Sequence, residues 1–171
     1  MKNTGIFYGS TTGTTERIAH RLAAIAGVSE SDIHNIAETA PSVLGDYDII
    51  LAGTSTWRDG TLQEDWYDFI DGASALDLQG HKIAVFGCGD ETMSETFCNA
   101  MGTLYHRLRE TGAEMFGQFP ADCYDFNASK AKAGDRMVGL ALDEVNHPDL
   151  SENRIAEWVK TLEEHLSMSK Q

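Results

Sequence analysis

The sequence has few cysteines, few prolines and no long apolar run. Its three cysteines, Cys88, Cys98 and Cys123, are an odd number without Cys-x-x-Cys spacing, which argues against a disulfide framework and a structural zinc site. No apolar stretch approaches the roughly 18–20 residues of a transmembrane helix, and the first residues lack the apolar core of a signal peptide. We therefore expect reduced thiols, no membrane partner and a cytoplasmic location.

Positive charge is also scarce. The 171 residues include 13 Lys plus Arg against 27 Asp plus Glu, which gives a formal net charge of −14. Because nucleic-acid binding depends on Lys and Arg that neutralise phosphates, we expect no nucleic-acid partner. The same charge favours encounter with basic protein surfaces. The length, together with the lack of a Gly/Ser-rich linker, predicts a single domain over residues 1–171.

Short apolar runs alternate with amphipathic segments along the chain. Nearly continuous hydrophobicity is typical of strands covered on both faces, and apolar residues at helical spacing predict helices between them. This alternation predicts a doubly wound α/β fold, with a parallel sheet between two helical layers. Ser151 suits a helix start. The strand runs are Gly5–Tyr8, Tyr47–Ala52, Lys82–Phe86 and Met137–Leu142, with weaker candidates at Ile33–Ile36 and Glu114–Gly117, and the helical patterns cover Ile18–Ile25, Phe97–Leu108 and Ile155–Leu166.

The first strand is followed by a loop rich in hydroxyl groups, residues 9–17. In sheets of this class ligands bind beyond the carboxyl ends of the strands. Hydroxyls, together with free N–H groups at a helix N-terminus, could hold one phosphate. The loop lacks the Lys of a phosphate-transferring P-loop, so the phosphate would be held and not transferred. An ordinary helix cap and turn is the alternative.

Two further loops follow buried strands. In Thr54–Gly60, Trp57 could stack on an aromatic ligand or pack onto the sheet, whereas Trp66 and Trp158 lie at helical spacing and are expected in the core. In the third loop, which runs from residue 86 to residue 94, two glycines would let the backbone approach a planar ring. The third Gly of a dinucleotide fingerprint is absent, which argues against NAD. Cys88 has no neighbouring base, so a buried thiol is expected there.

Together these three loops resemble those of the flavodoxins, and the resemblance extends from about residue 4 to residue 166. It implies a flavodoxin-like fold, in which a five-stranded parallel sheet binds FMN beyond the carboxyl ends of its strands. That position of FMN is a known property of the family. The segment Gln118–Arg136 resembles the insertion in the last strand of long-chain flavodoxins. The matching blocks are Gly5–Thr15, Phe86–Asp90, Phe97–Ala100 and Val138–Glu144.

Transferred position by position, the resemblance implies the residues that contact FMN. It places the phosphate on the first loop with help from Thr56, stacks Trp57 on one face of the ring, and sets Gly60, Gly89 and Asp90 at its polar edges. Met93 stands where the family usually has a Tyr on the outer face, in a loop one residue shorter, and it could pack on the ring or cap the next helix. The full set is Ser10, Thr11, Thr12, Gly13, Thr14, Thr15, Thr54, Ser55, Thr56, Trp57, Arg58, Asp59, Gly60, Gly87, Cys88, Gly89, Asp90, Met93, Phe97 and Asp143.

The resemblance implies a low-potential one-electron carrier with non-covalently bound FMN, no catalytic residue and no metal. Nine acidic residues against one Lys between Asp59 and Glu95 would disfavour a reduced, anionic flavin. The expected partners are basic-faced redox proteins, namely a reductase and acceptor enzymes, and the protein is expected to be a monomer. Alternatives are an FMN-dependent quinone or nitro-compound oxidoreductase and a passive FMN-storage module. A response-regulator receiver is excluded because Gly9-Ser10 and Gly53-Thr54 occupy the positions of its acidic residues.

Overall fold

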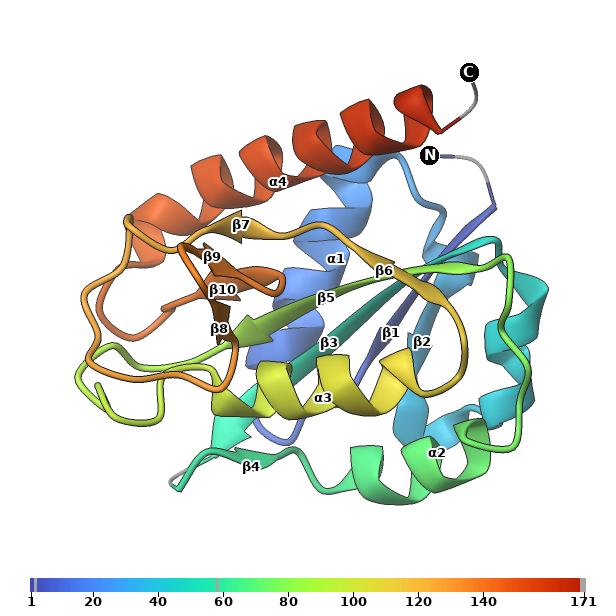
Figure 1. Cartoon of the computed structure of the whole chain (residues 1–171), viewed down its shortest axis with the longest axis horizontal. Coiled ribbons are helices and arrows are strands. Elements are labelled where there is room, and N and C mark those ends of the chain that lie inside the picture. The colour runs from blue at the N-terminus through green and yellow to red at the C-terminus, as the bar shows by residue number, and fades with distance from the viewer. Residues whose placement is uncertain (2, 58, 170–171) are drawn as a thin grey trace.

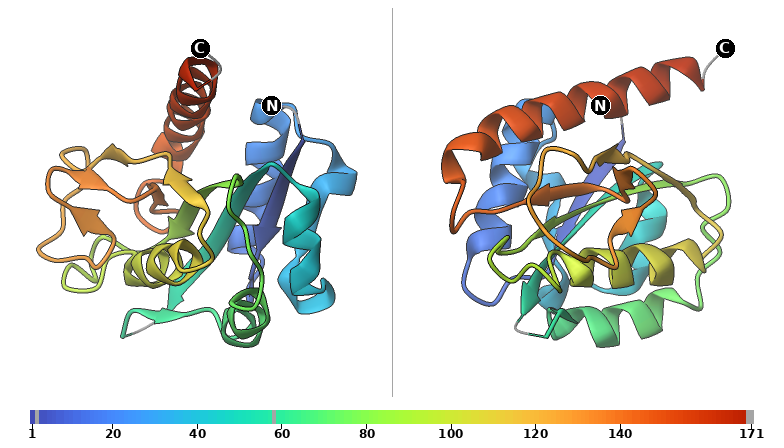
Figure 2. Two further views of the ribbon diagram at one scale, coloured as in Figure 1. Left: turned by 45° about the vertical axis from the view of Figure 1, so that its right-hand side comes forward. Right: turned by 60° about the vertical axis from the view of Figure 1, so that its left-hand side comes forward.

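The computed structural model describes residues 1, 3–57 and 59–169. Five parallel strands form the central sheet in the order β2-β1-β3-β5-β10 (Figure 1). Helices cover both faces of this sheet, and the two termini lie near each other at one end (Figure 2). The predicted doubly wound α/β class is confirmed. The five strands are β1 Thr4–Tyr8, β2 Ile33–Asn35, β3 Ile49–Trp57, β5 Lys82–Cys88 and β10 Leu140–Leu142.

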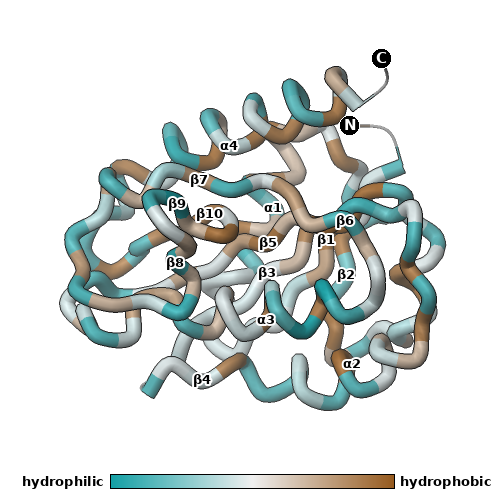
Figure 3. Tube along the Cα trace, viewed as in Figure 1, coloured by the Kyte–Doolittle hydropathy of each residue, from teal (hydrophilic) through white to brown (hydrophobic). Residues whose placement is uncertain are grey.

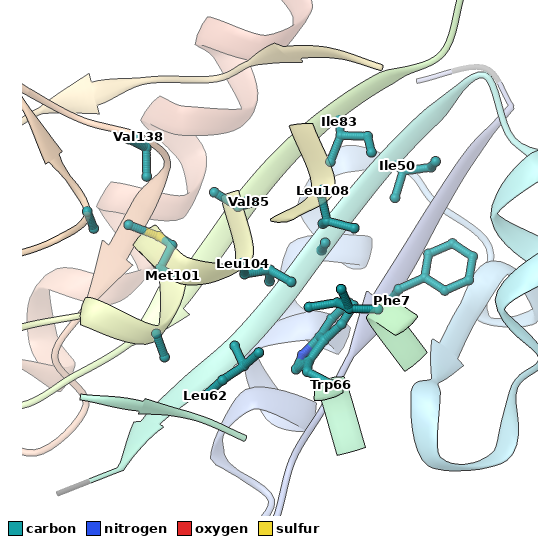
Figure 4. Packing of buried hydrophobic residues seen from close by; sticks show 14 of the residues in the cluster. Phe7, Ile50, Leu62, Trp66, Ile83, Val85, Met101, Leu104, Leu108 and Val138 are labelled. Atoms are coloured by element: carbon teal, nitrogen blue, oxygen red, sulfur yellow. The ribbon is translucent and has the colours of Figure 1, made fainter. Parts of the chain in front are cut away.

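Successive side chains of each strand point to opposite faces of the sheet, so each strand contributes to the hydrophobic core on both faces. Phe7, Ile50 and Val85 pack beneath two helices on one face, with Trp66 fully buried among them (Figure 4). On the other face, Trp158 extends from one of the two remaining helices into the core and is fully buried. Both tryptophans are core residues, as predicted. The helices are α1 Thr14–Ala26 and α4 Pro148–Met168 on the second face, and α2 Asp65–Ala73 and α3 Asn99–Arg109 on the first.

The hydropathy of the chain follows this layering. Apolar residues concentrate along β1, β3 and β5, and the helices are polar on their outer surfaces (Figure 3). None of the helices in the described ranges is long and apolar enough to span a membrane. The remaining short elements are the 3-10 turns Glu30–Asp32, Ile36–Glu38 and Pro41–Asp46, and the strand β4 Thr61–Leu62, which pairs antiparallel with β3.

The last strand of the sheet is split in two. β6, Glu114–Phe116, pairs with the first half of β5, and β10 pairs with its second half. The chain between them, residues 117–139, forms the predicted insertion, which we call the insertion below. It contains a small antiparallel sheet of three strands, β7 Phe119–Pro120, β9 Arg136–Met137 and β8 Lys132–Ala133.

Several predicted boundaries were wrong. β3 continues through residues 53–57 because β5 and β4 pair with that part of it, so most of the second loop belongs to a strand. The predicted strand Met137–Leu142 is two strands, β9 and β10, in different sheets. α4 begins at Pro148 and not at Ser151, with a proline in its first turn. Ile25 of the predicted apolar face of α1 is 36% exposed.

Candidate functional site

The first loop presents backbone donors at the carboxyl edge of the sheet. It leaves β1 with the Gly9 N–H bonded to the Gly53 carbonyl at 3.1 Å, and the Ser10 hydroxyl accepts the N–H of Gly13 at 3.1 Å. Gly13 precedes α1 in the left-handed conformation, φ 86°, and no side chain caps the helix. The first N–H groups of a helix have no acceptor within it, so this end of α1 suits an anion.

Gln63 supports the first loop, residues 9–17, which we call the phosphate-type loop. The sequence did not reveal this role. The Gln63 side chain is 1% exposed, and its Nε2 donates to Thr11 Oγ1 at 3.4 Å and to Asp65 Oδ2 at 2.7 Å. Its Oε1 accepts the Asp65 N–H at 3.2 Å. A Cβ added at Gly9 would overlap this amide. The amide therefore links the loop to the start of α2, which no local sequence pattern signals.

Trp57 ends β3 with its side chain 37% exposed. It lines a hollow of about 270 Å³ together with Thr11, Thr61, Leu62 and Glu64. The first loop and Trp57 therefore share one hollow at the sheet edge. This arrangement places hydroxyl groups and an aromatic side chain on the same opening, where they could contact a ligand that has both a phosphate and a ring.

One buried hydroxyl near the end of β3 is unsatisfied. Ser55 lies beside Cys88 in the sheet, and its buried Oγ has no hydrogen-bond partner among the described residues. The Cys88 thiol lies 3.8 Å from the Thr15 hydroxyl, and burial raises its pKa to about 12, as expected for an inert thiol. Since an unpaired buried polar atom is costly, the Ser55 hydroxyl is a candidate partner for a polar ligand group.

The third loop begins at Gly89, whose N–H donates to the Leu142 carbonyl at 2.9 Å. The Asp90 carboxylate accepts the Thr92 N–H and the Asn146 side-chain amide, both at 2.8 Å. The hydrogen bond from the Thr92 hydroxyl, more than any other interaction, holds the pKa of Asp90 below its ordinary value. Met93 is 50% exposed on the outside of the loop. The three predicted loops thus meet at one edge of the sheet, with a fixed negative charge in the third.

Comparison with known proteins decides the family. The flavodoxin family profile matches residues 6–158. The chain belongs to the flavodoxin family. It is 42% identical to Flavodoxin 1 of Escherichia coli over 170 residues, 98% of this chain and 97% of that protein. It is 40% identical to a Synechococcus elongatus flavodoxin over 170 residues, 98% of this chain and all of that protein. These relatives are electron carriers and not enzymes.

Solved flavodoxin structures share the fold. A flavodoxin of Fusobacterium nucleatum superposes with a TM-score of 0.87 at 24% identity, over 96% of this chain and 99% of that one. Flavodoxin 2 of Bacillus cereus superposes with a TM-score of 0.71 at 28% identity, over 95% and 99%. These matches confirm the flavodoxin-like architecture that the sequence predicted.

Several of the predicted flavin-contacting residues are engaged within the protein. Thr54 is buried, and its hydroxyl donates to the Ser55 carbonyl. Thr56 accepts the Ala100 N–H at 3.3 Å, so it caps α3. Phe97 is 1% exposed in the core against Tyr124 and Phe126.

The second loop closes in a tight turn. The Gly60 N–H donates to the Trp57 carbonyl at 2.7 Å, with Gly60 at φ 84°. A Cβ at this glycine would overlap Asn99. Asp59 is exposed, and Arg58 lies outside the described residues.

Asp143 organises the third loop from beneath. Its Oδ1 accepts the N–H groups of Val145 and Asn146, at 2.9 and 2.8 Å. Its Oδ2 accepts the Glu91 N–H at 3.0 Å and the Asn146 side-chain amide at 2.8 Å.

Glu91, Asp143 and His147 lie close enough to hold a metal ion. The Asp143 oxygens are already saturated, however, and Arg154 lies 3.9 Å from Glu91, so the cluster is better suited to hold the loop than to bind a cation.

Proposed function

We propose that this protein is a low-potential one-electron carrier that binds FMN without a covalent bond. The observation that carries the proposal is the shared hollow, which the phosphate-type loop and the exposed Trp57 both line. A flavin mononucleotide has the two matching parts, a phosphate and an aromatic ring. The solved Fusobacterium nucleatum flavodoxin of the same fold is described as bound to flavin mononucleotide.

The first loop would hold the phosphate. The uncapped end of α1 supplies N–H groups and the positive end of the helix dipole, and the hydroxyls of residues 10–12, 14 and 15 add further donors. No Lys lies in this loop, and Arg17 at the first turns of α1 donates to the Thr14 hydroxyl at 3.3 Å. Backbone and hydroxyl donors would therefore supply most of the binding, and the phosphate would stay intact.

Trp57 would cover one face of the ring, and Met93 would cover the other. When bound, the flavin supplies the capacity to take up single electrons. Trp57 would exclude water from the ring, and Asp90, whose pKa is lowered, would remain ionised near its edge. A negative charge in a poorly hydrated site disfavours further negative charge, which lowers the reduction potential. Met93 gives less stacking than an aromatic side chain, so we expect an outer face that is more open to solvent.

Basic-faced redox proteins would be the partners. The acidic side chains of Asp59, Glu64, Asp68 and Glu95 are exposed around the site, and Glu64 lines the hollow itself. Basic residues on a reductase or an acceptor would attract these carboxylates and raise the association rate. Salt would screen this attraction and lower the rate again. A partner bound there would meet the exposed edge of the flavin, which shortens the path of the electron.

An anaerobic reductive titration followed by visible absorbance tests the proposal. We expect the purified protein to hold FMN and to take up two electrons in separate one-electron steps, with no rapid NAD(P)H oxidation by the isolated protein. Uptake of both electrons in one step, together with such oxidation, would support the alternative of an FMN-dependent quinone or nitro-compound oxidoreductase. Failure to bind FMN after reconstitution would overturn the site.

A further inference from the structure

Residues 125–128 of the insertion are hydrogen-bonded to the third loop and to the residue that follows it. The Asp125 N–H donates to the Glu91 carboxylate at 3.2 Å, and the N–H groups of Asn127 and Ala128 both donate to the Ser94 carbonyl at 2.9 Å. The Asn127 side-chain amide donates to Ser94 Oγ at 3.3 Å and to Glu95 Oε1 at 2.7 Å. These contacts join two segments that lie more than 30 residues apart in the sequence.

The contacts continue to the start of α3. The Ser129 hydroxyl donates to the Phe97 carbonyl, and the Lys130 N–H donates to Asn99 Oδ1 at 2.7 Å. Residues 125–130 therefore run alongside residues 91–99 in the same direction. The insertion lies beside the chain that leads into α3 (Figures 1 and 2). We call residues 125–130 the brace.

Buried charges anchor the first end of the brace. Glu91 is nearly buried, and its carboxylate lies 3.9 Å from the Arg154 guanidinium of α4. Arg154 donates to the Cys123 carbonyl at 2.8 Å and lies over the Tyr124 ring at 4.4 Å. The insertion, the third loop and α4 thus meet at one buried ion pair.

Asp143 and Asn146 hold the third loop at Glu91 and Asp90, whereas the stretch after residue 91 relies on short turns. Its internal backbone bonds are short turns, from Met93 to Asp90 and from Thr96 to Met93. Thr92, Met93 and Glu95 are exposed. A loop without packed side chains loses conformational entropy when a ligand orders it, unless other contacts already hold it.

We propose that the brace is a positioning element that holds the third loop ready for the flavin. Asn127 and Ser129 fix the chain at Ser94, Glu95 and Phe97, and so set where the preceding Met93 faces the ring. The inference rests on the proposed function. It assigns to the insertion a share of FMN affinity and of the reduction potential, although we place none of its residues in contact with FMN.

The double variant Asn127→Ala/Ser129→Ala tests the proposal. It removes three side-chain hydrogen bonds to residues 94–97, together with the bond that Ser129 Oγ accepts from the Ala131 N–H, and leaves the bonds between backbone groups in place. We expect the dissociation constant of the apoprotein for FMN to rise about ten-fold. We also expect a shift in the two one-electron midpoint potentials of the loaded protein and faster amide exchange over residues 91–97. Asn127→Ala/Ser129→Thr keeps a hydroxyl at residue 129 and should recover part of each effect.

Arg136→Ala is the matched control, because its exposed side chain donates to the Gln118 carbonyl within the insertion, away from the loop. Wild-type affinity and potentials in the double variant would overturn the proposal, and so would equal effects in the control. If the double variant does not fold, Asn127→Ala alone, with its exposed side chain, should raise the dissociation constant about three-fold, and no change would overturn the proposal. If the wild type binds no FMN, the proposed function fails, while the exchange rates still decide whether the brace holds the loop.

Discussion

Gln63 offers the sharpest test of how the protein supports its phosphate-type loop. We compare Gln63→Glu with Gln63→Met, which is similar in size but uncharged. Both variants lose the bonds that Nε2 makes to Thr11 and Asp65. Only the Glu variant adds a carboxylate beside Asp65, at the position where the wild-type amide nitrogen lies 2.7 Å from the Asp65 carboxylate.

The charge should dominate the difference. Two like charges about 4 Å apart repel by about 4 kcal/mol at an effective dielectric of about 20. Because Asp65 is half-buried, solvent screening should reduce this to about 2 kcal/mol. We expect the Met variant to lose about 1–2 kcal/mol in the free energy of unfolding through its missing hydrogen bonds, and the Glu variant about 2 kcal/mol more at pH 7.

Urea unfolding and titration with inorganic phosphate and FMN measure both effects. At pH 7 the Glu variant should bind each at least ten-fold more weakly than the Met variant, since its charge lies against the phosphate-type loop. Burial and the neighbouring Asp65 should raise the pKa of the new carboxyl, so its penalty should vanish as pH falls below about 4.3, where the carboxyl is protonated in both states. Equal stability and equal phosphate affinity of the two variants at pH 7 would refute the charge argument, and wild-type stability and phosphate affinity in the Met variant would refute the role of Gln63.

Three further predictions follow from burial. In the folded protein only Cys123 should react with a thiol reagent, because burial raises the pKa of Cys88 to about 12 and that of Cys98 well above its usual range. Unfolding should expose all three thiols, and rapid labelling of more than one thiol in the folded protein would contradict the prediction. Burial lowers the pKa of His34, so its contribution to the free energy of unfolding should be fully present above pH 6.5 and should be lost as the pH falls, because the unfolded chain gains a proton first. His34→Asn should reduce the pH dependence of the free energy measured by urea unfolding in this range, and an unchanged slope would contradict the prediction. Gly139→Ala should lower the free energy of unfolding by about 1–3 kcal/mol, because a Cβ there would overlap a carbonyl of β5, and wild-type stability in calorimetry would refute the contact.

Much of the sheet could be predicted because its signals are local. A strand covered on both faces needs a continuous apolar run, and a helix on that sheet needs apolar residues on one face, so β1, β5 and α3 were recognisable from their own residues. The phosphate-type loop was also local, because it depends on consecutive hydroxyls and glycines at the start of α1. The third strand was predicted too short, since pairing with β4 and β5 extends it beyond its apolar residues.

The sequence by itself determined the α/β class, the three loops at the carboxyl edge of the sheet and the acidic character around them, because each depends on residues that are neighbours in the chain. Only the tertiary structure decided what holds those loops. Gln63 reaches Thr11, and Asn127 reaches Ser94, across 52 and 33 residues respectively. The tertiary structure also placed Phe97 in the core and the Asp143 carboxylate beneath the third loop. Such contacts depend on how separate elements pack together, and no periodicity within one element reports them.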